Sequence, residues 1–431
     1  MCFFVLIVLL PALVLGGQLA DEKSTYTMAG FDPSDVYRDW NTNLFFQRMQ
    51  QKTGIQFHYS QYSDAKTWQQ AKKGMTAESD LPDVLFKAEI TPAEAMDMRQ
   101  RGVLIDLMPL LEMHAPNLWA LLQQHPEYHQ ALTLPDGSIA ALPYIDLFPA
   151  QNCIWINQDW LDQLKLPMPT TADEFEQMLL AFKEKDPNRN GKKDEVPLTF
   201  TGAYDLKYLG HAFGLVANDY NLFVQDNQVR FMPSEPAFQD FISWCAGLYQ
   251  SKLIDADSFV VSDVLRRVTD AKSTPIHGGI MAPMGSYFLP VDWTQKYVAL
   301  EPMVYENNQV YRSITGPVTT GTFAITSACE QPEEMLNWVD YLYSQEGAIL
   351  ASEGVEGEDY LVDGDGTWRK TEEATQNSFL SNVAINTGAV APGISSDIFQ
   401  QLYYDPMIQN VSKQVQMVAS YAREPFPPFS L

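Results

Sequence analysis

Residues 186–195 read Asp-Pro-Asn-Arg-Asn-Gly-Lys-Lys-Asp-Glu, a run in which oxygen-bearing side chains recur at alternate positions. A hard cation such as Ca²⁺ takes about six to eight oxygen ligands, and a short loop with this spacing can fold them inward. Gly191 permits a sharp turn within the run. The candidate ligands are Asp186, Asn188, Asn190, Lys192 through its backbone carbonyl, Asp194 and Glu195. An ordinary polar turn without a metal has the same composition, and the spacing alone does not separate the two interpretations.

The residues around this loop show which elements flank it. Pro197 stands where an EF-hand has its last glutamate, and Val196–Thr201 has the composition of a strand, so the loop is not an EF-hand. Upstream, Thr171-Ala-Asp-Glu174 is a capping box that opens a helix. Apolar residues then recur at helical spacing, at Phe175, Met178, Leu179 and Phe182. The predicted order is helix, oxygen-rich loop and strand.

This order of elements, with Ile154-Trp-Ile-Asn-Gln-Asp-Trp-Leu161 before it, resembles the family 1 extracellular solute-binding proteins. These are the sugar receptors of bacterial ABC importers. The similarity is to the branch with a structural calcium loop, which includes the alginate-binding receptors. The loop of that branch, Asp-x-Asn-x-Asn-x-Lys-x-Asp-Glu, matches residues 186–195. The resemblance implies a structural Ca²⁺ and an α/β, two-lobe periplasmic-binding-protein type II fold with hinge crossovers.

The first part of the chain alternates strand and helix patterns, which is typical of an α/β sheet with parallel strands. Thr25–Met28 and Asp83–Phe86 have strand patterns, and Gly54 ends a predicted helix as a C-terminal capping glycine. Pro92 begins another helix at a position where proline is tolerated. Further along, Pro332–Leu350 is predicted to form one helix.

The length of 431 residues suits two lobes better than one simple core. The resemblance implies that residues 24–146 and 315–370 form lobe 1. Residues 149–312 and 372–431 are expected to form lobe 2, which holds the calcium loop. Strands that cross between lobes at a shared hinge suit a clamp that closes on a ligand. The expected crossings lie near 146–149, 312–316 and 365–375.

The ligand of such a fold binds in a crevice outside the carboxyl ends of the strands. Sugars present flat C–H faces and a rim of hydroxyls, so aromatic rings and hydrogen-bonding polar side chains suit them. The candidate ligand contacts are Phe31, Asp32, Lys87, Tyr144, Asp146, Trp155, Tyr287, Asp292 and Trp293. The resemblance favours Tyr287 and Trp293, whereas Trp155 lies on a predicted strand and suits the core equally well. For each of these residues, ordinary packing is the alternative.

The apolar run Cys2–Leu15 is too short to span a bilayer comfortably and predicts a signal peptide over residues 1–20. No cysteine follows the run to accept a lipid, which argues against lipid anchoring. The expected location is therefore the extracellular face of the cell membrane or the periplasm. The net charge of −26 argues against nucleic acid and anionic membrane surfaces as partners.

No nucleophile elbow, zinc-protease helix, P-loop or dinucleotide fingerprint occurs in the chain. With 54 acidic residues, pairs of carboxylates are unavoidable and do not indicate a glycosidase. The sequence therefore favours a non-catalytic, monomeric receptor that captures an oligosaccharide and delivers it to an ABC transporter permease. The alternative is an extracytoplasmic carbohydrate-active hydrolase or lyase. A third interpretation is a ligand-sensing partner of a membrane kinase.

Overall fold

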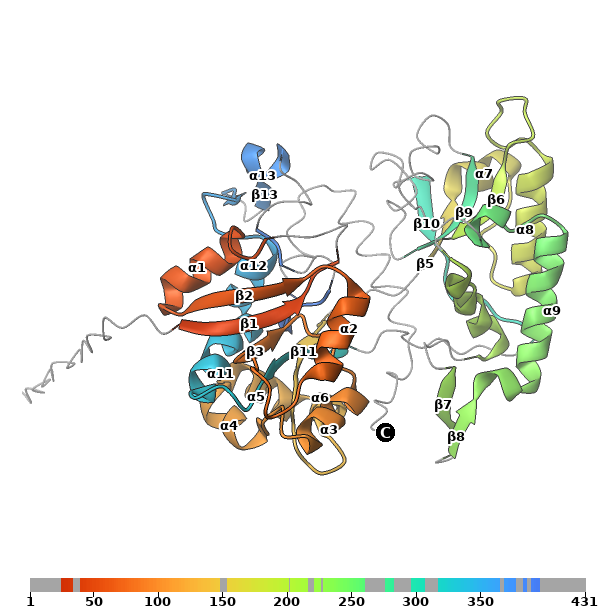
Figure 1. Ribbon diagram of the computed structural model, residues 1–431. Coiled ribbons are helices and arrows are strands. Elements are labelled where there is room, and N and C mark those ends of the chain that lie inside the picture. Colours follow the sequence, from red (N-terminus) through yellow and green to blue (C-terminus); the bar gives the residue numbers. More distant parts are fainter. Residues whose placement is uncertain are drawn as a thin grey trace, which may run out of the picture.

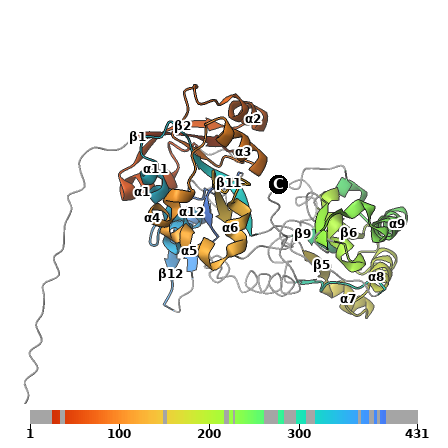
Figure 2. The ribbon, with the colours of Figure 1, turned by 90° about the horizontal axis from the view of Figure 1, so that it is seen from below.

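The described elements gather in two bodies, each built around its own sheet (Figures 1 and 2). The computed structural model describes residues 25–33, 39–147, 153–200, 202–215, 221–225, 228–259, 276–282, 296–306, 317–364, 368–376, 383–385 and 389–395. The predicted signal peptide lies outside these residues.

The first sheet has six strands in the order β14-β4-β11-β3-β1-β2. Every strand runs parallel to the others except β11, which is antiparallel to both of its neighbours. The strands are β1 (Thr25–Phe31), β2 (Gln56–Tyr62), β3 (Val84–Phe86), β4 (Leu142–Ile145), β11 (Val318–Ile325) and β14 (Gly393–Ile394). The parallel arrangement predicted from the alternating pattern is confirmed.

Helices cover this sheet, and the predicted ends of several are confirmed. Gly54 follows α1 in a left-handed conformation (φ 74°), and Pro92 opens α3 behind a capping box of Thr91 and Glu94. The helices are α1 (Leu44–Thr53), α2 (Ala65–Gly74), α3 (Pro92–Gln100), α4 (Met108–His114), α5 (Pro116–Gln124), α6 (Pro126–Leu132), α11 (Pro332–Asp340) and α12 (Gln345–Ser352).

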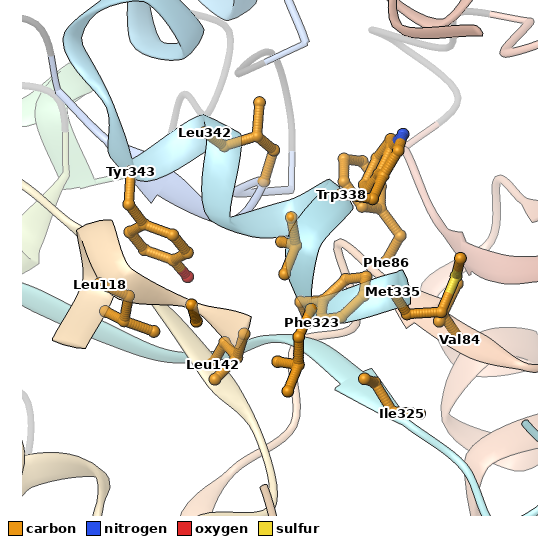
Figure 3. Packing of buried hydrophobic residues seen from close by; sticks show 14 of the residues in the cluster. Val84, Phe86, Leu118, Leu142, Phe323, Ile325, Met335, Trp338, Leu342 and Tyr343 are labelled. Atoms are coloured by element: carbon orange, nitrogen blue, oxygen red, sulfur yellow. The ribbon is translucent and has the colours of Figure 1, made fainter. Parts of the chain in front are cut away.

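The helix predicted over Pro332–Leu350 is divided in two. A 3-10 turn, Tyr341–Tyr343, follows α11, and the Ser344 hydroxyl then accepts a hydrogen bond from Gly347 N at 3.1 Å to begin α12. The Tyr343 hydroxyl donates to the backbone carbonyl of Pro143 at 2.5 Å. Figure 3 shows how α11 packs, with Met335 and Trp338 lying on side chains of β3 and β11. Packing against β4 therefore overrides the local helical pattern.

The second sheet has the order β10-β5-β9-β6, in which β5 is antiparallel to the other three strands. Its strands are β5 (Cys153–Asn157), β6 (Val196–Phe200), β9 (His277–Ala282) and β10 (Tyr297–Ala299). Its helices are α7 (Gln158–Leu164), α8 (Ala172–Glu184), α9 (Pro236–Gln250) and the 3-10 helix η1 (Ala203–Phe213), and a hairpin of β7 (Leu222–Gln225) and β8 (Gln228–Phe231) lies beside them. The capping box predicted at Thr171 and Glu174 opens α8.

One part of the expected lobe assignment is wrong. The expectation places residues 372–431 in lobe 2, but β14 pairs with β4 in the first sheet through Gly393 and Ile394. Ile385 and Ala391 also belong to the apolar core of the first body. Helix α13 (Glu372–Gln376) and the hairpin of β12 (Tyr360–Val362) and β13 (Trp368–Lys370) lie on the same body (Figure 1). Backbone pairing over such a long sequence separation leaves no local pattern.

We expect Gly30→Ala to lower the free energy of unfolding by at least ~2 kcal/mol, because it overpacks a closed site. A Cβ at Gly30 would lie 1.7 Å from the carbonyl oxygen of Phe86 on the neighbouring strand. Gly74→Ala is the matched control, since Gly74 ends α2 with open space around its Cα and alanine favours a helix. Urea denaturation of both variants measures the difference, and equal midpoints would contradict the close packing of β1 against β3.

Candidate functional site

All strands of the two sheets except β11 and β5 end at the edge from which β4 leaves the first sheet and β5 enters the second. Five strands of the first sheet end at one edge, and β4 continues from that edge through residues 146–152 into β5. A connection of this length spans at most about 28 Å. Its end, Cys153, pairs with Ala282, which is the last residue of β9. The rule that ligands bind outside strand carboxyl ends therefore indicates the region between these two edges.

Three of the predicted ligand contacts lie together at the first-sheet edge, but inside the protein. Phe31 is 5% exposed, and Asp32 and Lys87 are each 1% exposed. The Lys87 ammonium forms an ion pair with the Asp32 carboxylate, which also accepts a hydrogen bond from Trp40 Nε1 at 2.8 Å. The two charges satisfy each other below the surface of the described structure, and the role of these residues as ligand contacts stays a prediction. The pair links the end of β1 to the end of β3.

Two further candidates lie at the exit from β4. Tyr144 and Asp146 are both half-buried, and burial raises the pKa of the Tyr144 phenol well above its usual range. The backbone N–H of Asp146 donates to the carbonyl of Pro317 at 2.6 Å, and its carboxylate accepts from Ser395 Oγ at 2.8 Å. Asp146 thus holds together three chain segments that leave or enter the first sheet at this edge.

The remaining candidates belong to the second body. Trp155 is 1% exposed and donates from Nε1 to the carbonyl of Ala282 at 2.9 Å. This burial favours the core interpretation of Trp155, and its role as a ligand contact stays a prediction. Tyr287, Asp292 and Trp293 lie outside the described residues, so their role stays a prediction.

The segment that follows β3 is unusual in its backbone. Lys87 and Glu89 have φ angles of 51° and 48°, in the left-handed region that residues other than glycine seldom adopt. Glu89 is exposed, whereas Ala88 and Ile90 on either side are buried. Glu89 follows the predicted strand Asp83–Phe86, where the strand-end rule places crevice residues, although it is not among the nine candidate contacts. Its only sequence signal is its position just after a strand, because no glycine or asparagine marks the left-handed turn.

Neighbouring groups fix this segment firmly. Ala88 and Ile90 donate backbone hydrogen bonds to β11, at the carbonyls of Thr322 (3.1 Å) and Gly321 (3.0 Å). Trp68 Nε1 donates to the carbonyl of Ala88 at 2.9 Å, and the buried Lys72 ammonium donates to that of Glu89 at 2.6 Å. These contacts compensate the cost of the left-handed residues, which is about 1–3 kcal/mol each.

The loop predicted to bind calcium turns its polar groups inward. The Asp186 carboxylate accepts hydrogen bonds from the backbone N–H groups of Asn190 and Gly191, each at 3.1 Å. Asn188 and Asn190 both donate from their side-chain amides to the Asp194 carboxylate, at 3.2 Å and 2.9 Å. These side chains therefore share one small volume.

Two observations bear on whether a cation fits this loop. Glu195 Oε1 is buried and has no hydrogen-bond partner among the described residues. Burial, with Asp186 and Asp194 nearby, raises the pKa of Glu195, whereas hydrogen bonds from Asn190 lower that of Asp194. No group of three His, Cys, Asp or Glu side chains in the described part of the chain is arranged to hold a metal. Amide and carbonyl oxygens would have to complete the set, which is chemistry that suits Ca²⁺.

A small hollow and the character of the helices were the other features of the described structure that could indicate a site, and neither does. A hollow lined by Pro92, Leu134 and Gly321 has a volume of about 20 Å³, which suits a water molecule rather than a sugar. Among the described helices, none has both the length and the apolar character needed to cross a membrane.

Comparison with solved structures identifies the fold. The chain superposes on an extracellular solute-binding protein from Bifidobacterium longum subsp. infantis with a TM-score of 0.78 and 20% identity, over 94% of this chain and 83% of that one. It has the fold of the ABC-importer solute-binding proteins. The alginate-binding protein AlgQ2, solved without calcium ion, shares this solute-binding fold with a TM-score of 0.72 and 20% identity, over 95% and 85% of the two chains.

A sequence relative is the fructooligosaccharide ABC transporter substrate-binding protein FusA of Streptococcus pneumoniae. It is 31% identical over 253 residues, which cover 56% of this chain and 46% of FusA, so the match spans about half of the relative. The FusA structure in complex with kestose has a TM-score of 0.72 and 22% identity, over 93% and 85% of the two chains. No protein-family model matches the chain. The resemblance to ABC sugar-binding proteins and the two-lobe α/β fold are confirmed.

Proposed function

We propose that this protein is a non-catalytic receptor that captures an oligosaccharide outside the cytoplasm and delivers it to an ABC transporter permease. The observation that carries the proposal is the 31% identity to a substrate-binding protein named for fructooligosaccharides. The solute-binding fold supports it over nearly the whole chain. The export signal over residues 1–20, the extracellular location, the permease partner and the monomeric state are parts of the same proposal.

The ligand site in this proposal lies between the carboxyl edges of the two sheets. Lobe 1 would comprise residues 24–146 and 315–370 together with β14, and lobe 2 would comprise residues 149–312. Asp146 supports a hinge at this position, because it links the chain leaving β4 to the segments at Pro317 and Ser395. Two lobes joined by a few short segments can close on a ligand and open to release it.

A carbohydrate-active hydrolase or lyase is the competing function. The relative and the structural neighbours are named as binding proteins rather than enzymes, which favours the receptor. An enzyme would also need two carboxylates at a set separation across the sugar. The buried Asp32 is already paired with Lys87, so it is a poor candidate for one of them.

We also propose that the loop 186–195 binds one structural Ca²⁺. The inward-facing carboxylates of Asp186 and Asp194 and the unpaired Glu195 oxygen support a cation between them. A solved form of FusA is described as an EF-hand mutant, and the AlgQ2 structure is described by its lack of calcium, which supports a metal in related loops. The loop connects α8 to β6, away from the first sheet, so its role would be structural.

Ligand-free protein should gain several degrees in melting temperature with one class of oligosaccharide, because a ligand that binds only the native state stabilises it. A thermal-shift panel of neutral and acidic oligosaccharides checks this, with reducing-sugar release measured on the same samples. A receptor leaves the sugar intact. Release of reducing ends would instead favour the hydrolase, and a flat panel would contradict an oligosaccharide receptor.

Removal of Ca²⁺ by EDTA should lower the melting temperature, and Asp194→Ala should abolish that response. Saturation at a hundredfold excess over Kd is worth about 2.7 kcal/mol of stability. Asp162→Ala, an exposed carboxylate on α7, is the control and should respond to EDTA as the natural protein does. Metal analysis after mild dialysis should find about one Ca²⁺ per chain. If EDTA leaves every melting temperature unchanged, the loop is a turn without a metal.

A further inference from the structure

Glu89 is the charged side chain that the segment after β3 exposes at the candidate ligand edge. Lys87 and Glu89 both adopt left-handed backbone conformations. With this backbone, Lys87 is buried in the protein and Glu89 is exposed at its surface. Strained conformations of this kind persist only where surrounding contacts enforce them, and they cluster at functional sites.

Two buried residues, Gly321 and Lys72, help to hold the backbone in these left-handed conformations. Gly321, with φ 73°, lies in an irregularity of β11, and a Cβ there would be 1.8 Å from the carbonyl oxygen of Ile90. The buried Lys72 ammonium donates a hydrogen bond to the backbone carbonyl of Glu89 at 2.6 Å and forms an ion pair with the Glu94 carboxylate at 3.4 Å. The Glu89 backbone is therefore held in one place, and its carboxylate projects from a rigid support.

At this edge, both described lysines after or beside β3 are paired with carboxylates, whereas the carboxylate of Glu89 is exposed. Lys87 is neutralised by Asp32, and Lys72 lies beside Glu94, so neither cation is open to a ligand. No hydrogen bond of the Glu89 carboxylate falls within the described residues. The half-buried Asp146 adds a second carboxylate at the same edge. Lys66 is exposed at the start of α2, near Asp64, whose pKa is lowered mainly by hydrogen bonds from Thr67 and to a smaller extent by Lys66.

We infer that Glu89 binds hydroxyl groups of an uncharged oligosaccharide and disfavours sugars that carry carboxylates. This inference rests on the proposed receptor function and narrows it to a substrate class. An ionised carboxylate only accepts hydrogen bonds, and two neighbouring sugar hydroxyls can donate to its two oxygens. Such charge-assisted bonds are roughly twice as strong as neutral ones.

A uronic acid at the same place would bring a second negative charge to a partly desolvated site. Like charges juxtaposed at an interface cost several kcal/mol. The two buried lysines already pair with Asp32 and Glu94, so forming an ion pair with an incoming carboxylate would compete with those contacts. The described edge of the first lobe therefore selects for neutral sugars by repulsion as well as by attraction.

The test compares the full chain with Glu89→Ala and Glu89→Gln by titration calorimetry. The probes are neutral fructo-oligosaccharides of the kestose series, neutral gluco- and galacto-oligosaccharides, and oligogalacturonate and alginate oligosaccharides of similar length. The control is Glu112→Ala, which removes an exposed carboxylate from α4. We expect the natural protein and the control to bind a neutral sugar with the same Kd, and Glu89→Ala to weaken that binding at least tenfold.

The pH dependence separates direct contact from a supporting role. Although Glu89 is exposed as a residue, partial desolvation of its carboxyl group raises its pKa, while Lys72 and Lys87 lower that pKa and Glu94 raises it further. Protonation removes the acceptor, so neutral-sugar binding should weaken as the pH falls from 7 through that pKa. Glu89→Gln should lose this pH dependence, and circular dichroism at each pH verifies that both proteins stay folded.

Each outcome decides one of the two claims. Neutral-sugar binding that Glu89→Ala leaves unchanged would overturn the role of Glu89. Preferential binding of a uronate would overturn the neutral substrate class and leave the receptor function standing. Binding of no sugar in the panel by the natural protein would overturn the receptor function, and this inference with it.

Discussion

The buried ion pair of Lys87 and Asp32 is the contact on which the candidate site depends. A charge enclosed in a protein must be paired, and removing one partner typically costs about 3–5 kcal/mol. Here the pair ties the carboxyl ends of β1 and β3 together and draws Lys87 inward. The backbone then turns through a left-handed residue on each side of Ala88, which brings Glu89 to the surface. The buried Lys87–Asp32 ion pair thereby helps to place the exposed Glu89 carboxylate at the strand edge.

The topology brings this edge to the second lobe. Because β4 and β14 run parallel to β1 and β3, the chain leaves the first sheet twice at the same edge, at Asp146 and Ser395. The second sheet begins at Cys153, opposite the carboxyl end of β9. The short connection from β4 to β5 therefore joins the carboxyl edge of the first sheet to that of the second. Two lobes that close on a ligand need their strand ends arranged in this way.

The elements with local signals were predictable from the sequence. The capping box at Thr171, the glycine that ends α1 and the strands of the parallel sheet all rest on neighbouring residues. The polarity of a side chain did not predict its exposure, because Asp32 and Lys87 are charged and yet internal. The left-handed Glu89 and the return of β14 to the first sheet depend on distant contacts, at Lys72 and β4 respectively. No pattern within a single segment encodes them.

Hydrogen–deuterium exchange with and without a bound neutral oligosaccharide tests the central claim, that the strand carboxyl edges form the ligand site. Backbone amides covered by a ligand or by lobe closure exchange more slowly, whereas amides remote from it are little changed. The account predicts protection in peptides that contain residues 87–91 and 144–147, with no comparable change in the calcium loop 186–195. Protection confined to other surfaces, while these two segments exchange as in the free protein, would contradict it.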